Sequence, residues 1–478
     1  MQWTDFLVLM KQELAMATII AVLLIAKVAG TDATDETRSK QNASIQFLVN
    51  GLLVLTLVLG FTGTESGNLF ADMYRTSPLI LLQKNILTLG TLLISLLSGN
   101  WLSTHKHLTE FYVLLLSTLL GMFLMISSAN LLMFYLGLEL STIPLAALVN
   151  FDLDKRRSSE AAMKMIISSA FSSALLLLGV SFLYGSAGTL SFDLLPALMN
   201  GSDLQLFSFV LILAGFGFKI SAVPFHLWTA DVYEGAPVPV TAFLSVISKG
   251  AVLFIFLTVL YQVFGPLQQA WYVMLFLLSV FTLVTGNLFA LRQQNLKRML
   301  AFSSITQVGF ILVGISASGE TGASSVVYFV LVYIFSNLSA FGVVGVVSAL
   351  TGKETIDDFK GFYKNNKFLS WVITIGLFAL AGVPPTAGFF GKFFLLLAGA
   401  SKGNFLLLTI AALNMVVALY YYLRVVKAIF MDENEQPIEP LRISLTTRVA
   451  LILCMAGVLL AGIYSPVYSF IDQLVKGM

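Results

Sequence analysis

Residues 211–251 decide the fold, and they read LILAGFGFKISAVPFHLWTADVYEGAPVPVTAFLSVISKGA. The stretch holds two apolar segments with one lysine each, Lys219 and Lys249, and a proline, Pro224, between the lysines. A membrane span needs about 20 mostly apolar residues. An ionisable side chain inside a span costs at least about 2.5–3.5 kcal/mol on insertion scales, so it is a functional candidate by default. The stretch therefore predicts membrane-crossing helices that contain functional charged residues.

The composition of the whole chain agrees with this prediction. Of its 478 residues 58% are apolar and 11% are charged, against roughly 25% charged in an ordinary soluble domain. The mean hydropathy is +0.89 and the net charge is +2. These values exclude a soluble enzyme, a disordered chain and a nucleic-acid-binding module. The single cysteine, Cys454, excludes a disulfide framework, an iron–sulfur site and a thiolate zinc site. We expect an all-α membrane protein.

About fourteen apolar segments are long enough to be transmembrane helices. Their centres lie near residues 20, 53, 88, 118, 140, 173, 216, 251, 280, 308, 338, 384, 418 and 457. We interpret the first segment as a retained helix rather than a signal peptide, because Asp5 and Glu13 precede it. In the longest connection, residues 190–199 are amphipathic and are expected to lie along the membrane interface.

The lysine and arginine residues of the loops predict the orientation. If the loops are numbered from the first, the odd loops hold fifteen Lys and Arg residues and the even loops hold Arg75 and Lys402. Loops rich in positive charge stay in the cytoplasm. We therefore expect the odd loops inside and both chain ends outside, which is the periplasmic side of a bacterial inner membrane.

Motifs for soluble cofactors are absent from the sequence. It contains no G-x-G-x-x-G, no Walker A sequence and no C-x-x-C. His105 and His107 are close enough to suggest a metal pair, but a solvated loop explains them better. We expect no cofactor on this chain, and any chemistry must use protons, ions or membrane-soluble molecules.

The charges inside the predicted spans are the candidate site residues. Glu139, Lys219, Lys249 and Lys392 lie deep in apolar segments, and Lys164 lies one turn after Glu160. Burial disfavours a charged amine and a nearby carboxylate favours it, so a change in their separation would load or unload a proton. This set predicts a proton relay.

Other ionisable residues have a more ordinary interpretation. We expect Lys27, Lys106 and Lys427 to reach the headgroups, and Lys84 to be a residue at the start of a span. His226, just after Pro224, is either a relay group or a histidine at a helix end. Asp231 and Glu234 are interpreted as structural or entrance groups.

Prolines beside two of the lysines predict broken helices. Pro224 follows Lys219 by five residues, and Pro384 and Pro385 precede Lys392. Broken backbone at membrane depth is tolerated only inside protein or beside a wet cavity. The spacing suggests two inverted five-helix repeats with broken seventh and twelfth helices. The single membrane domain is then divided into residues 1–107 with three helices, 108–265 with the first repeat, 266–430 with the second repeat, and 431–478 with a C-terminal helix.

Four segments together resemble the antiporter-like membrane subunits of respiratory complex I. They are GFKISAVPFHLWTADVYEGAPVPVTAFLSVISKGA (217–251), LGLELSTIP (136–144), GNLFALRQQNLKRMLAFSSI (286–305) and LAGVPPTAGFFGKF (380–393). These segments extend over the middle three-quarters of the chain and are quite specific. The resemblance implies proton translocation coupled to quinone reduction.

The resemblance also implies roles for individual residues. Glu139 and Lys219 would form the ion pair of one half-channel, Lys249 the central relay, and Lys392 the group of the second half-channel. Lys164 and His226 match further relay positions of the family. One departure is Gln307, which stands where relatives often have a histidine and which cannot carry a proton at neutral pH.

Partners and cofactors follow from the resemblance as well. NADH, FMN, the iron–sulfur clusters and the quinone would be bound by partner subunits. This chain would contact the bilayer and other membrane subunits of complex I, and no nucleic acid. Two alternatives remain open: a subunit of a multisubunit sodium/proton antiporter, and a structural scaffold. The buried charges oppose a scaffold, because a scaffold gains nothing from them.

Overall fold

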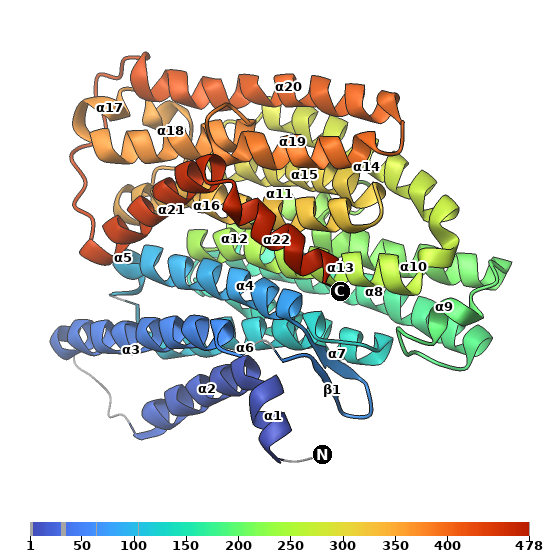
Figure 1. Ribbon diagram of the computed structural model, residues 1–478. Coiled ribbons are helices and arrows are strands. Elements are labelled where there is room, and N and C mark those ends of the chain that lie inside the picture. Colours follow the sequence, from blue (N-terminus) through green and yellow to red (C-terminus); the bar gives the residue numbers. More distant parts are fainter. Residues whose placement is uncertain (1–2, 30–34, 64, 104, 478) are drawn as a thin grey trace.

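The computed structural model describes residues 3–29, 35–63, 65–103 and 105–477, and almost all of its regular structure is helical. Figure 1 shows the helices packed side by side in one bundle, with a short β-hairpin at one end. The predicted all-α architecture is confirmed. Met1 and Met478, which are predicted to lie on the periplasmic side, are not among the described residues.

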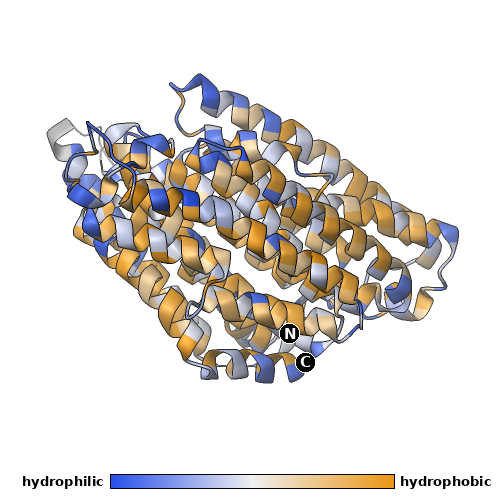
Figure 2. Ribbon diagram, turned by 90° about the horizontal axis from the view of Figure 1, so that it is seen from above, coloured by the Kyte–Doolittle hydropathy of each residue, from blue (hydrophilic) through white to orange (hydrophobic). Residues whose placement is uncertain are grey.

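Twelve helical segments of the described chain are long and apolar enough to cross a membrane. They are α3 (Asp35–Phe61), α4 (Pro78–Leu97), α6 (Leu108–Ile126), α7 (Leu131–Val149), α8 (Arg156–Ala187), α10 (Asp203–Ile220), α14 (Gln268–Leu291), α15 (Leu296–Ser316), α16 (Glu320–Thr351), α20 (Phe405–Phe430), α21 (Leu445–Ile463), and a composite of α12 (Val238–Phe243), η1 (Leu244–Ser248), α13 (Lys249–Thr258) and η2 (Val259–Val263). Figure 2 shows hydrophobic residues along these helices and hydrophilic residues gathered toward their ends.

The two remaining predicted spans also correspond to helices. The first is α2 (Lys11–Ala29), and the twelfth consists of α18 (Lys367–Ala381) and α19 (Ala387–Ala400) with a break between them. A similar break follows α10, and α11 (Leu227–Gly235) continues beyond it. The prolines lie in these breaks, as predicted.

Shorter elements connect the long helices. They are α1 (Trp3–Leu9), β1 (Gly67–Leu69), β2 (Tyr74–Thr76), α5 (Gly99–Leu102), α9 (Leu195–Leu198), η3 (Gly265–Leu267), η4 (Asp357–Phe359), α17 (Phe362–Asn365) and α22 (Pro466–Lys476). The two strands pair antiparallel, with Gly67 opposite Thr76. The pair closes the connection between α3 and α4.

The bundle has a buried centre and an exposed periphery. Every residue in the most apolar 18-residue stretch of α15 is buried. The corresponding stretches of α4, α16 and the composite helix from α12 to η2 are nearly as buried. In α3 only 22% of the residues in the corresponding stretch are buried. A helix that is apolar all round and fully buried is an interior helix, whereas α3 shows its apolar face to lipid or to another chain.

Matched helices support the two predicted repeats. α8 and α16 are each 32 residues long, and each ends at a glycine with a φ of 70°, Gly188 and Gly352. Glycine adopts this left-handed conformation without steric cost, so it ends a helix cleanly. The next long helix after each of them is a broken one, α10–α11 after α8 and α18–α19 after α16.

The structure adds detail to two expectations about connections. Residues 190–199 have one face buried in the protein, with Phe192 and Leu195, and one exposed face, with Leu194 and Leu198, and only α9 is helical. Their location along the membrane interface stays a prediction. The backbone N–H of Phe192 donates to the carbonyl of Ala129, which ties the loop to the start of α7. The region 431–478 holds two helices rather than one, since α22 follows α21 and packs against α16.

Candidate functional site

Lys219 lies in the last turn of α10, beside the break, rather than midway along a continuous helix. Its Nζ donates to the hydroxyl of Ser169 on α8 at 2.7 Å and to that of Thr142 on α7 at 2.9 Å. Glu139 accepts a hydrogen bond from Ser173, also on α8. Hydroxyl groups of α8 thus contact both the acid and the amine, and Thr142 of α7 also contacts the amine.

The direct ion pair between Glu139 and Lys219, which the resemblance implied, is not present in the described structure. Ser169 and Ser173 lie four residues apart on one face of α8, and four helical residues rise about 6 Å. Thr142 lies three residues after Glu139, on the same face of α7. The two charged groups are therefore about one helical turn apart, with hydroxyls between them.

Lys164 lies near one end of the bundle. Its Nζ is 2.8 Å from Glu160 and 2.7 Å from Asp231 on α11. Asp231 and Glu234 in turn bind Arg298 of α15, at 2.9 Å and 2.7 Å. These residues line a cavity of about 250 Å³. Lys164 is a mouth residue in this structure, not one enclosed among apolar side chains.

His226 is the residue before α11 and is buried. Its Nδ1 has no hydrogen-bond partner among the described residues. It lies beyond the break, and no hydrogen bond among the described residues joins it to Lys219, so it remains either a relay group or a histidine at a helix end.

Lys249 occupies the centre of the bundle. It is 2% exposed and begins α13, directly after the π-helical turn η1. A π-turn inserts an extra residue and re-aims the side chains that follow it. The Nζ of Lys249 donates to Ser304 of α15 at 2.7 Å and lies 5.4 Å from the centre of the Tyr233 ring. Neutral hydroxyl and aromatic groups thus hold this amine.

Polar groups continue from Ser304 toward the second broken helix. The neighbouring Ser303 is hydrogen-bonded to the hydroxyl of Tyr422 on α20. Gln307, one turn further on α15, donates to the same hydroxyl at 3.2 Å and to the carbonyl of Leu380 at 3.0 Å. Gln307 therefore occupies the position of the expected histidine as a fixed polar link between α15, α20 and α18.

Lys392 ends this series of contacts. Its Nζ donates to the carbonyl of Leu380 at 2.6 Å and to that of Ala381 at 3.2 Å, and lies 4.6 Å from the Phe310 ring centre. A helix end leaves its last carbonyls without intrahelical partners. The break after α18 therefore supplies the acceptors for this buried amine, as the prolines indicated. Gln307 and Lys392 share one of them.

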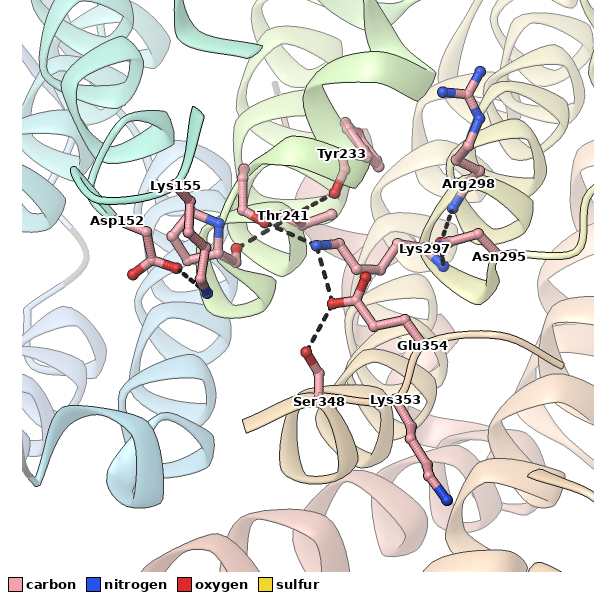
Figure 3. A network of polar contacts seen from close by, with 12 residues as sticks. Asp152, Lys155, Tyr233, Thr241, Asn295, Lys297, Arg298, Ser348, Lys353 and Glu354 are labelled. Atoms are coloured by element: carbon pink, nitrogen blue, oxygen red, sulfur yellow. Dashed lines mark hydrogen bonds and ion pairs between the residues drawn. The ribbon is translucent and has the colours of Figure 1, made fainter. Parts of the chain in front are cut away.

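A charged cavity of about 380 Å³ opens between α4, α12 and α16. Lys297 at the start of α15 is 4% exposed and donates to the carbonyl of Ala236 at 3.1 Å, with Glu354 at 3.4 Å (Figure 3). Ser348 binds the same carboxylate at 2.7 Å. Sequence reasoning treated Lys297 only as a loop charge, because its partners come from other segments of the chain.

Two of the three lysines predicted to reach the headgroups, and the lysine predicted at the start of a span, have carboxylate partners in the structure. Lys27 and Lys427 are exposed and pair with Glu110 at 3.0 Å and Asp432 at 3.3 Å. Lys84 lies near the start of its span, in the second turn of α4, as expected, but it is fully buried and pairs with Glu13 at 2.6 Å. This pair was missed because the sequence separation between α2 and α4 hides it.

The histidine pair of the loop has a packing role. His105 stacks on Phe151 with ring centres 4.8 Å apart, and this burial lowers its pKa, which Asp152 at 3.9 Å opposes. His107 lies beside Glu110. The described residues contain no group of three or more metal-binding side chains.

Comparisons with known proteins agree on one family. The family described as NADH:quinone oxidoreductase/Mrp antiporter, TM, matches residues 128–418. A protein of Azobacteroides pseudotrichonymphae named NADH-quinone oxidoreductase subunit N is 43% identical, over 100% of this chain and 99% of its own. One of the same name from Phocaeicola vulgatus is 46% identical, over 88% and 90%.

Solved structures have the same fold. A chain of respiratory complex I from Thermus thermophilus matches with a TM-score of 0.78 and 27% identity, over 96% of this chain and 98% of that one. A chain of the Mrp complex from Dietzia matches with a TM-score of 0.85 at 18% identity, over 98% and 96%, which concerns the fold alone. The chain therefore belongs to the NADH:quinone oxidoreductase/Mrp antiporter membrane family, in its branch of NADH-quinone oxidoreductase subunit N.

Proposed function

We propose that this chain carries protons across the membrane within an NADH:quinone oxidoreductase, through Glu139 and the lysines of its membrane helices. The observation that carries the proposal is the set of buried polar groups between Lys249 and Lys392. The Lys249 amine contacts Ser304, and the adjacent Ser303 contacts Tyr422. Gln307 also contacts Tyr422, and it shares the Leu380 carbonyl with Lys392. These groups come from α13, α15, α20, α18 and α19. An interior built only for packing would fill these positions with apolar side chains, because buried polar groups cost free energy unless they are paired.

The first repeat supplies the other half of the path. Glu139 and Lys219 are coupled electrostatically through the hydroxyls of α7 and α8. Lys164 and Asp231 line an entrance at the odd-numbered loops. The cavity beside Lys297 opens at these same loops, and we propose it as the entrance toward Lys249. With the predicted orientation, this entrance faces the cytoplasm of a bacterial cell.

Partner subunits would supply the redox chemistry. The chain has no sequence motif for NADH, and the proposal assigns NADH, FMN, the iron–sulfur clusters and the quinone to other subunits. Neighbouring membrane subunits of the complex would cover the exposed apolar faces of the bundle. The rival function, a subunit of a sodium/proton antiporter, shares the fold, but the relatives at 43–46% identity are named as oxidoreductase subunits.

Lys249→Met tests the proposal, because methionine keeps the length of the side chain and removes the titratable amine. Membrane vesicles containing the assembled complex should oxidise NADH but acidify less per NADH than the parent. Lys427→Met, on the exposed surface, is the matched control and should leave acidification unchanged. Normal acidification by an assembled Lys249→Met complex would contradict the proposal.

A further inference from the structure

A second buried acid–base cluster lies outside both repeats. Glu13 of α2 and Lys84 of α4 are 3% and 0% exposed, and the Lys84 Nζ is 2.6 Å from Glu13 Oε1. The hydroxyl of Tyr74, on strand β2, donates to the same oxygen at 2.9 Å and accepts from Lys84 at 3.2 Å. An acid, an amine and a phenol therefore meet in one fully buried contact.

The neighbouring residues extend this polar contact by one more pair. Gln12 donates to Asn85 at 2.7 Å, so the adjacent residues of α2 and α4 form two successive polar contacts. Gly60 of α3 faces the second pair, and a Cβ there would lie 1.9 Å from Asn85 Oδ1 and 2.4 Å from Gln12 Nε2. Any larger residue at position 60 would displace these amides. Three helices are thus shaped around the cluster.

Several buried polar atoms around the cluster lack a partner among the described residues. They are Glu13 Oε2, Gln12 Oε1, Asn85 Nδ2 and Thr76 Oγ1. Buried polar groups are almost always hydrogen-bonded, and internal water is the usual partner where protein supplies none. The free oxygen of Glu13 is therefore the natural contact for water.

The cluster lies near the surface at the end of the bundle that holds the β-hairpin. Glu13 is in the first turn of α2 and Lys84 in the second turn of α4. One charged group beside this site is Lys11, which donates to the carbonyls of Thr62 and Gly63 and interacts with Glu65 and Lys84. In the predicted orientation this end faces the outside of the cell.

We propose that Glu13, Lys84 and Tyr74 form a hydrated proton-exchange site between the bundle and the outside water. The proton of the Lys84 ammonium passes to Glu13 Oε1, which leaves a neutral amine and a carboxylic acid. The carboxyl group then rotates, so that this proton points to the water beside the unpaired oxygen position. The acid gives the proton to that water, and the cluster becomes a carboxylate beside a neutral amine. A proton from water restores the ammonium, so charge and atoms balance over the cycle. This inference rests on the proposed function, since the exchanged protons are those that the bundle carries.

A structural pair and an exchange site respond differently to apolar replacement. Replacing both members of a buried ion pair by apolar residues of similar volume is often neutral for stability, whereas removing one member leaves an unpaired charge. The double variant Glu13→Leu with Lys84→Met should therefore assemble and oxidise NADH. Because it has no ionisable pair, we expect a loss of acidification per NADH oxidised in membrane vesicles.

The control is an exposed pair that joins α2 to α6, Lys27→Met with Glu110→Gln, which should acidify like the parent. If the Glu13 and Lys84 double variant assembles and acidifies like the parent, the cluster is only a structural link and the proposal is overturned. If the double variant does not assemble, Glu13→Gln alone replaces it, and the same loss is expected. The Lys249→Met variant distinguishes failure of this exchange site from failure of the proposed function. Acidification equal to that of the parent in the Lys249→Met complex would overturn the proposed function itself.

Discussion

Lys219, Lys249 and Lys392 all lie next to hydroxyl groups or free carbonyls rather than in contact with a carboxylate. Such partners accept a hydrogen bond from an ammonium group without fixing its charge as strongly as a direct ion pair does. The identity of these buried residues was predictable, since each is alone among apolar neighbours along the chain. Their partners were not, because Ser169, Ser304 and the Leu380 carbonyl come from other helices.

Glu139 and Lys219 should act as one unit even though hydroxyls separate them. Glu139→Gln and Lys219→Ala each remove one end of the same interaction, so their effects on proton translocation should be strongly non-additive. The measurement is a double-mutant cycle on acidification by vesicles, with assembly checked in each variant. Two losses that simply multiply would show that the pair is uncoupled. Glu139→Gln with Ser172→Ala is the additive control, because the Ser172 hydroxyl of α8 donates to the Gly215 carbonyl instead.

At the scale of elements, close helix packing positions the site. α6 and α7 approach so closely that a Cβ on Gly121 would lie 2.4 Å from the backbone nitrogen of Ser141, two residues after Glu139. In the second repeat, a Cβ on Gly286 of α14 would lie 2.5 Å from the Thr306 hydroxyl of α15, next to Gln307. The first two helices of each repeat thus meet through a glycine beside a candidate residue. Sequence patterns predicted the helices but not these contacts, because helices that are apolar all round have no periodic face.

Gly121→Ala should destabilise the subunit by about 1–3 kcal/mol, the usual cost of overpacking, because the neighbouring atoms are backbone and cannot rotate away. It should also reduce acidification by moving Glu139. Gly51→Ala is the matched control, since nothing lies within 4 Å of the position on α3. That change should be neutral or stabilising by up to about 1 kcal/mol, because alanine favours a helix over glycine. Thermal unfolding of the detergent-purified complex is the measurement, and equal behaviour of the two variants would contradict the packing argument.

At the scale of the whole molecule, the number of spans and the two breaks were predictable from hydropathy and prolines. Hydropathy succeeds because the bilayer allows few structures other than helices. The arrangement around α15, the buried Glu13–Lys84 pair and α22 were not predictable, since each depends on contacts between distant segments. The short helix α22 is too short to span and gave no hydropathy signal, yet its Asp472 accepts from Ser324 of α16 at 2.9 Å.

The orientation of the bundle is a separate prediction. The odd loops should face the cytoplasm, because they hold most of the positive charge. The native Cys454 is buried, so new single cysteines can be labelled selectively. Asp154→Cys, in an odd loop, should react with an impermeant thiol reagent only in inverted vesicles. Lys402→Cys, in an even loop, should react only in intact cells or right-side-out vesicles, and the reverse pattern would invert the predicted topology.

Acidification by complexes that carry Lys392→Met or Lys392→Arg tests the central claim most directly. The contacts of Lys392 with the two carbonyls place its amine at the end of the polar series, so loss of that amine should interrupt proton movement. Methionine removes the charge, and arginine keeps a charge that it cannot release at physiological pH. We predict that both assembled variants oxidise NADH with less proton translocation per NADH than the parent. Proton translocation equal to that of the parent in an assembled Lys392→Met complex would contradict the account.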